Sequence, residues 1–130
     1  MTRREEISAE GQPEPLSHYT DAVRVEGPLL FVSGVVPVDE TGALVGGDDV
    51  VAQARQVFAN IGAVLEAAGA TFADVVKVTL FLTDVDDRAR INPVREEVFG
   101  STRPASTLVE VAALAVPGAR IEVEAVAVVS

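Results

Sequence analysis

The sequence reads Arg103-Pro-Ala-Ser-Thr-Leu-Val-Glu-Val-Ala-Ala-Leu114 and, after a short connection, Ile121-Glu-Val-Glu-Ala-Val-Ala-Val-Val129. Both segments are rich in β-branched residues, and the connection Ala115-Val-Pro-Gly-Ala119 carries turn residues. The pattern therefore predicts a hairpin or a pair of neighbouring strands. After Glu124 the second segment is apolar on both faces, which indicates a strand buried near the middle of a sheet.

Three carboxylates, Glu110, Glu122 and Glu124, lie inside these predicted strands. An ionised carboxylate is costly to bury without hydrogen-bond donors or a cation. Such residues border either a functional site or a subunit interface, or they form a solvated rim along one edge of the sheet. The pattern alone leaves both interpretations open.

The composition fits one folded domain, because the chain has 130 residues and 48% of them are hydrophobic. Residues 1–14 are charged and contain Pro and Gly, so we expect a flexible arm there and a single domain over residues 15–130. The net charge of −10 argues against nucleic acid as a partner, since phosphate binding depends on Lys and Arg. We see no signal segment and no apolar run of membrane-spanning length, so we expect a cytoplasmic protein without a membrane partner.

Three further strands are predicted from apolar, β-branched runs. Residues 22–26 and 29–33 are separated by a Gly-Pro turn, and residues 75–82 form the strongest run. Residues 43–45 form a short edge strand at most, because Pro37 and a turn precede them.

Two helices are predicted between these strands. The first can be capped by Asp48 or Asp49, shows apolar residues at helical spacing and stops at Gly69. Gln53 falls on its polar side. The second is expected to begin with Pro93 as its first helical residue, capped by Asn92.

This order of elements predicts an α+β fold in which one mixed sheet carries both helices on a single face. The opposite face of the sheet would then be left uncovered. Because its strands are apolar, we expect an oligomer in which sheets pack together.

Several common catalytic sites are excluded or disfavoured. The chain has no Cys, and its single histidine, His18, cannot form a histidine-based metal site alone, so we interpret it as a surface loop residue. Asp84, Asp86 and Asp87 lack the spacing of a calcium loop and are interpreted as a solvated loop that caps the next helix. Gly46-Gly47-Asp48-Asp49 lacks the lysine and spacing of a phosphate-binding loop. No metal site is predicted.

Several further short motifs are present along the chain: Tyr19-Thr-Asp-Ala22, Phe31-Val-Ser-Gly34, Gln53-Ala-Arg-Gln56, Leu65-Glu-Ala-Ala-Gly69, Val75-Val-Lys-Val-Thr-Leu-Phe-Leu-Thr-Asp84 and Arg103-Pro-Ala105. Together with Val109-Glu-Val-Ala112 and Ile121-Glu-Val-Glu-Ala125, they resemble the Rid (YjgF-like) family of reactive-intermediate imine and enamine deaminases. The resemblance covers nearly everything from residue 15 onward. It implies a chorismate-mutase-like fold and a homotrimer with a central β-barrel, whose small-molecule ligands bind in clefts between subunits.

The resemblance also implies roles for particular residues. Glu122 matches the catalytic acid that holds the attacking water, and Tyr19 and Ser33 match residues that line the cleft. Asn92 and Glu110 match positions that flank it. We expect Ser106 and Glu122 to lie on one side of a cleft built from two subunits. In the family mechanism water adds to a protonated imine carbon and ammonia leaves, so no metal or organic cofactor is implied.

Two positions depart from the family pattern. Ser106 stands where deaminating members carry the arginine that binds the substrate carboxylate, and a hydroxyl offers neither charge nor a bidentate fork. Arg103, three residues upstream, is a candidate to bind the ligand in its place. On a regular strand it would point to the opposite face, so this replacement requires an irregular loop. Arg95 stands where the family often has an aromatic residue, and we interpret it as a solvent-facing helix residue, although it could return positive charge to the cleft.

The sequence therefore predicts a protein that acts on a small imine or enamine by water addition, but not on ordinary 2-imino acids, because Ser106 replaces the arginine. The alternative is a non-catalytic trimer that binds a small molecule or a partner protein. A ribonuclease is disfavoured by the acidic charge and by the lack of a histidine pair.

Overall fold

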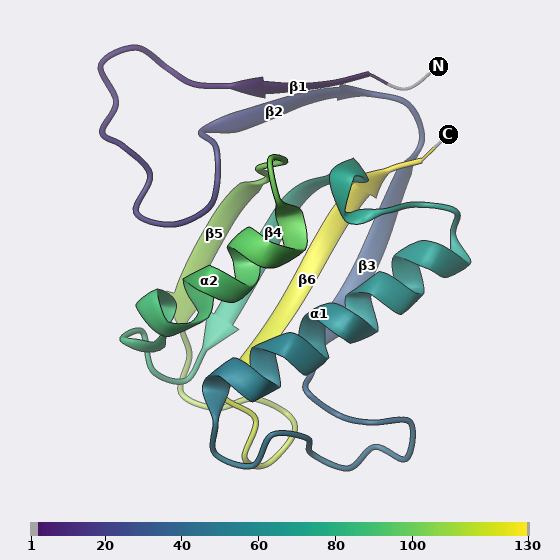
Figure 1. Ribbon diagram of the computed structural model, residues 1–130, viewed down its shortest axis with the longest axis vertical. Helices are drawn as coiled ribbons and strands as arrows, with labels where there is room; N and C mark the ends of the chain where they lie inside the picture. Colours follow the sequence, from purple (N-terminus) through teal and green to yellow (C-terminus); the bar gives the residue numbers. More distant parts are fainter. Residues whose placement is uncertain (1–2, 130) are drawn as a thin grey trace.

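The computed structural model describes residues 3–129, and Figure 1 shows how its elements are arranged. In chain order these are β1 (Arg3–Ile7), β2 (Ala22–Glu26), β3 (Leu29–Val35), α1 (Val50–Ala67), the 3₁₀ turn η1 (Phe72–Asp74), β4 (Val75–Leu82), α2 (Asp87–Phe99), β5 (Ala105–Glu110) and β6 (Ile121–Val128).

A four-stranded mixed sheet with the order β3-β6-β4-β5 forms the centre of the molecule. β4 runs parallel to β5, whereas β6 is antiparallel to both of its neighbours. Both helices cover the same face of this sheet (Figure 1), which confirms the predicted α+β class. β6 lies between two strands, and Ile121, Val123, Ala125 and Ala127 are buried, so its prediction as a central strand is also confirmed.

The expected pairing of the two C-terminal segments is wrong, because β4 lies between β5 and β6. Parallel neighbours need a crossover connection, and α2 supplies it between β4 and β5. Residues 111–120 then carry the chain past β4 to its other edge. A ten-residue connection allows this, whereas a tight turn would have forced a hairpin.

The N-terminal segment does not form the expected loose arm over its whole length. β1 pairs with β2 in a separate two-stranded sheet, so β2 and β3 do not form a hairpin across Gly27. The charges of β1 find partners within the fold: Arg4 donates hydrogen bonds to the carbonyls of Val75 and Arg103. Residues 43–45 form no strand, only an isolated bridge.

Helix α1 follows the sequence prediction closely, apart from one residue. Asp49 is its N-cap, and the carboxylate accepts the N–H groups of Val51 and Ala52. Gln53 is fully buried rather than on the polar side, because its amide is saturated by hydrogen bonds. It donates to the carbonyls of Gly47 and Gly118 and accepts the N–H of Arg120. The core beneath the helix contains Val57, Phe58, Ile61, Leu65, Val78, Leu80, Leu82, Ile91, Val94, Phe99 and Val123.

Helix α2 begins six residues earlier than predicted, at Asp87, and contains Pro93 in its interior. Proline cannot donate the helical hydrogen bond to Ala89, but that residue is exposed, so water can solvate its carbonyl. Asn92 is therefore not the cap of this helix.

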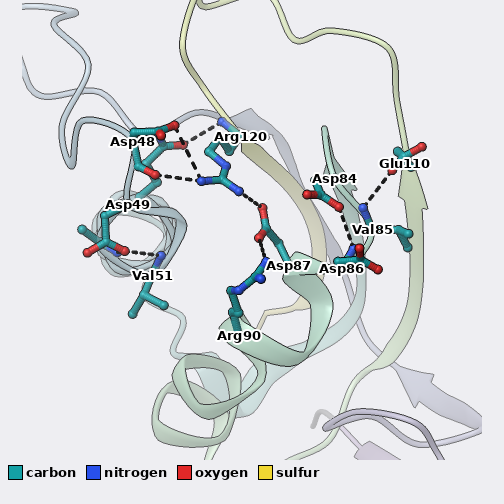
Figure 2. A network of polar contacts seen from close by, with 12 residues as sticks. Asp48, Asp49, Val51, Asp84, Val85, Asp86, Asp87, Arg90, Glu110 and Arg120 are labelled. Carbon is teal, nitrogen blue, oxygen red and sulfur yellow. Dashed lines mark hydrogen bonds and ion pairs between the residues drawn. The ribbon is translucent and has the colours of Figure 1, made fainter.

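The interpretation of Asp87 as part of a solvated loop is wrong, because its side chain is fully buried. Its carboxylate accepts hydrogen bonds from Arg120 at 2.8 Å and from Arg90 at 2.6 Å. Arg120 also donates to the carbonyl of Asp48 (Figure 2). These hydrogen bonds and ion pairs connect the start of α1, the start of α2 and the residue before β6.

Candidate functional site

A cavity of about 280 Å³ lies between the loop that precedes β2, helix α2 and strand β5. Its polar groups come from Ser17, Tyr19, Arg88, Arg95 and Ser106, and its apolar walls from Leu16, Val85 and Leu108. It therefore combines two of the predicted site residues, Tyr19 and Ser106, with two arginines of α2.

Arg95 is only 1% exposed, so its interpretation as a solvent-facing residue is wrong. Its Nη2 donates to Ser106 Oγ at 3.0 Å and to the carbonyl of His18 at 3.4 Å, whereas its buried Nε has no partner. Burial lowers the pKa of Arg95 to about 10, against the opposing effect of the nearby Tyr19. A guanidinium thus reaches Ser106 from the helix instead of from β5.

Asn92 holds the loop that carries Tyr19. Its side-chain carbonyl accepts the N–H of His18 at 2.8 Å, and the Tyr19 hydroxyl accepts the N–H of Leu16. His18 is half-buried as a residue, and its ring Nε2 lies 2.8 Å from the carbonyl oxygen of Gly100, which ties this loop to the end of α2. Asn92 therefore positions a wall of the cavity without lining it.

Glu110 flanks the same cavity from β5. Its carboxylate accepts the N–H of Val85 at 2.9 Å, a contact visible on the right of Figure 2. Val85 lines the cavity, so Glu110 fixes the loop that leads into α2.

Arg103 does not line this cavity, because Glu6 of β1 binds it. The N–H of Arg103 donates to Glu6 at 2.9 Å, and its Nε lies 3.6 Å from the same carboxylate. Burial alone would raise the pKa of Glu6, but hydrogen bonds from Arg103 and Arg4 hold it below its usual range. Arg103 lines a neighbouring surface hollow beyond Tyr19 instead.

Glu122 and Ser106 lie on opposite faces of the sheet, which corrects the expectation that they share one side of a cleft. In the strand register Glu122 lies opposite Phe81, and Ser106 lies beside Val78. Residues an odd number apart on one strand point to opposite faces. Val78 is buried under the helices, so Ser106 faces the helices and Glu122 faces the uncovered side.

A bulge in β3 brings Gly34 against Glu122. The pairing of β3 with β6 shifts between Val32 and Val35, which places the exposed Ser33 and Gly34 at the irregularity. A Cβ at position 34 would lie 2.3 Å from Glu122 Oε2. The carboxylate therefore rests over bare backbone, in a position that only glycine permits.

Where Glu122 acts as the catalytic acid that the family resemblance implies, Gly34→Ala should lower kcat/KM for imine hydrolysis by about tenfold, because a displaced catalytic group costs rate steeply. The obstructed atom is the end of a flexible side chain, and Gly34 does not have a positive φ, so the melting temperature should change little. Ammonia-release rates and a thermal melt test this together. Unchanged activity would show that the carboxylate position is not critical.

Residues 3–129 contain no cluster of His, Cys, Asp and Glu suited to holding a metal ion. Over the same residues, no helix has the length and apolar character needed to cross a membrane.

Comparison with known proteins identifies the family. Residues 9–129 match the family model described as Endoribonuclease L-PSP. A crystal structure of a conserved Rid-family protein from Yersinia pestis superposes with a TM-score of 0.90 at 35% identity, over 97% of this chain and 98% of that one. This chain belongs to the Rid family.

Other Rid-family relatives have comparable identity. A RutC family protein of Pyrococcus horikoshii is 44% identical over 95% of this chain and 97% of its own length. A protein of Salmonella typhimurium named 2-iminobutanoate/2-iminopropanoate deaminase is 41% identical over 94% of this chain and 95% of its own.

Sequence reasoning missed Arg88 of this Rid-family cavity, and for Arg95 it preferred the solvent-facing interpretation over the alternative that this residue returns positive charge to the cleft. Arg95 falls four residues after Ile91 and four before Phe99, and helical spacing places it on the same face as these two buried apolar residues. The position of Arg95 on this apolar face was the sequence signal that its side chain is buried. Arg88 lies two turns before Arg95, so the same helical spacing places it near the same cavity.

Proposed function

We propose that this protein hydrolyses small imines or enamines without a cofactor. Water adds to the carbon of a protonated imine, the resulting carbinolamine loses ammonia, and a carbonyl compound is released. Glu122 accepts the proton of the attacking water and returns it to the departing nitrogen. The proposal is supported by relatives named imine deaminases and by the close approach of the Glu122 carboxylate to the bare backbone at Gly34.

We further propose a homotrimer in which Glu122 of one copy completes the arginine cavity of a neighbour. The observation that carries this is the strand register, which puts the two halves of the site on opposite faces. The face that bears Glu122 also exposes apolar side chains, with Phe31 74% and Val109 39% exposed. Such a surface favours packing against another sheet.

The substrate differs from an ordinary 2-imino acid with a neutral side chain. On the β5 wall, Ser106 presents only an uncharged hydroxyl to the substrate. The guanidinium of Arg95 enters the cavity from the opposite wall, on α2. A carboxylate bound there is held from a different direction, so the imine carbon of a short 2-imino acid would be displaced from the attacking water.

Ammonia release from imines generated in place by an amino-acid oxidase tests the function. We expect the protein to accelerate release from some members of a panel that varies in charge and size, with 2-iminopropionate among the slowest. Treatment with a metal chelator should leave the rates unchanged. Binding of a panel member without any acceleration would instead favour the alternative, a non-catalytic ligand-binding trimer.

A further inference from the structure

Arg88 and Arg95, here called the arginine pair, differ from the other arginines of the chain. Within residues 4–129 every other arginine has a carboxylate within 4.0 Å: Arg4, Arg24, Arg55, Arg90, Arg103 and Arg120. The arginine pair has none. Arg88 donates from Nη1 to the carbonyl of Leu16 and to Ser17 Oγ, both neutral groups.

This arrangement is unexpected in so acidic a protein. The chain carries 20 Asp and Glu against 10 Lys and Arg, yet none of these acids pairs with the two guanidinium groups that line one cavity. Removing a charge from water without a counter-ion is unfavourable. Arg95 bears most of this cost, because it is 1% exposed and its Nε has no acceptor. A bound anion would relieve it.

We propose that the arginine pair is a dianion subsite and that the preferred substrate is the imine of a small dicarboxylic acid. The inference rests on the proposed function and names its substrate class. One carboxylate pairs with the Arg95 guanidinium and accepts the Ser106 hydroxyl. The other pairs with Arg88, seven residues away and about 10 Å along the helix axis between Cα atoms.

The size and walls of the cavity agree with such a ligand. A volume of about 280 Å³ holds a four- or five-carbon chain. Leu16, Val85 and Leu108 present apolar walls against which the methylene groups can pack. Planar guanidinium groups suit the bidentate geometry of carboxylates.

Isothermal titration of the full-length protein with succinate, propionate and inorganic phosphate tests the subsite. We expect succinate to bind at least tenfold more tightly than propionate, and more tightly than phosphate. Arg95→Met should weaken succinate binding by at least tenfold, and Arg95→Lys by less, since it keeps the charge but loses the fork. Arg88→Met should remove the preference for succinate over propionate.

Arg55→Met is the matched control, because it also deletes one positive charge but lies on the exposed side of α1, paired with Glu97. It should leave all affinities within about twofold. Equal affinity for succinate and propionate, or tighter binding of phosphate, would overturn the proposal. Ammonia release from neutral imines without succinate binding would refute the subsite while leaving the hydrolase proposal intact.

A thermal melt separates a ligand-binding role of Arg95 from a structural one. Arg95→Met should raise the melting temperature of the ligand-free protein, by about 5 °C, because it removes an uncompensated buried charge. Succinate should raise the melting temperature of the wild type but not of this variant. A lowered melting temperature with unchanged succinate affinity would make Arg95 purely structural and overturn the proposal.

Discussion

Glu122→Gln is expected to lower kcat/KM for imine hydrolysis by about 10²- to 10⁴-fold, the usual contribution of a general base. The amide keeps the shape of the side chain but cannot accept the proton of the attacking water. Initial rates of ammonia release measure the effect. Binding of succinate should be preserved, since its two carboxylates pair with the arginine pair and not with Glu122.

Glu124→Gln provides the matched control for this loss. Glu124 lies two residues along β6, on the same face as Glu122, and is exposed. Its neutralisation should leave kcat/KM within about twofold. If both variants lost activity equally, the effect would be one of general charge on this face, and Glu122 would have no specific role.

Asp87→Ala is expected to lower the free energy of unfolding by about 3–5 kcal/mol, because removing one partner of a buried ion pair leaves the other uncompensated. Asp87 has an exposed fraction of 0% and accepts hydrogen bonds from both Arg120 and Arg90. Urea denaturation monitored by far-ultraviolet circular dichroism measures the change.

Asp48→Ala tests whether the destabilisation expected for Asp87→Ala is caused by the burial of the ion pair. Asp48 also lies near Arg120, with its carboxylate 3.6 Å from Nη1, but its side chain is fully exposed. Exposed pairs contribute little, so this variant should leave the urea midpoint close to that of the wild type. Equal destabilisation by the two substitutions would mean that the buried network adds no particular stability.

The local sequence pattern predicted the helices and strands well where residues close together in the sequence determine them. The apolar spacing of α1, an aspartate cap at position 48 or 49 and the central position of β6 followed from periodicity and capping chemistry, and the structure shows Asp49 as the cap. Pairing between distant segments did not follow, because β5 and β6 carry no signal that β4 lies between them. The interior position of Pro93 was missed for a similar reason, since packing of α2 on the core outweighs one lost hydrogen bond.

The candidate site, too, was only partly predictable from the sequence: the residue identities were, but their positions in space were not. Family motifs nominated Glu122, Tyr19, Ser33, Asn92, Ser106 and Glu110, but only the strand register separates Glu122 from Ser106. The buried states of Arg95 and Asp87 depend on partners that are distant in sequence, respectively His18 with Ser106 and Arg120. A charged residue is normally exposed, so composition alone favours the wrong environment for both.

Mixed oligomers test most directly whether two copies build each site. Glu122→Gln and Arg95→Met subunits, each of low activity alone, would be refolded together in equal amounts and assayed for ammonia release. If one subunit provides the arginine face and its neighbour the glutamate face, about a quarter of the clefts should contain both intact residues. The account predicts recovery of about a quarter of wild-type activity, and a mixture no more active than its two parents would contradict it.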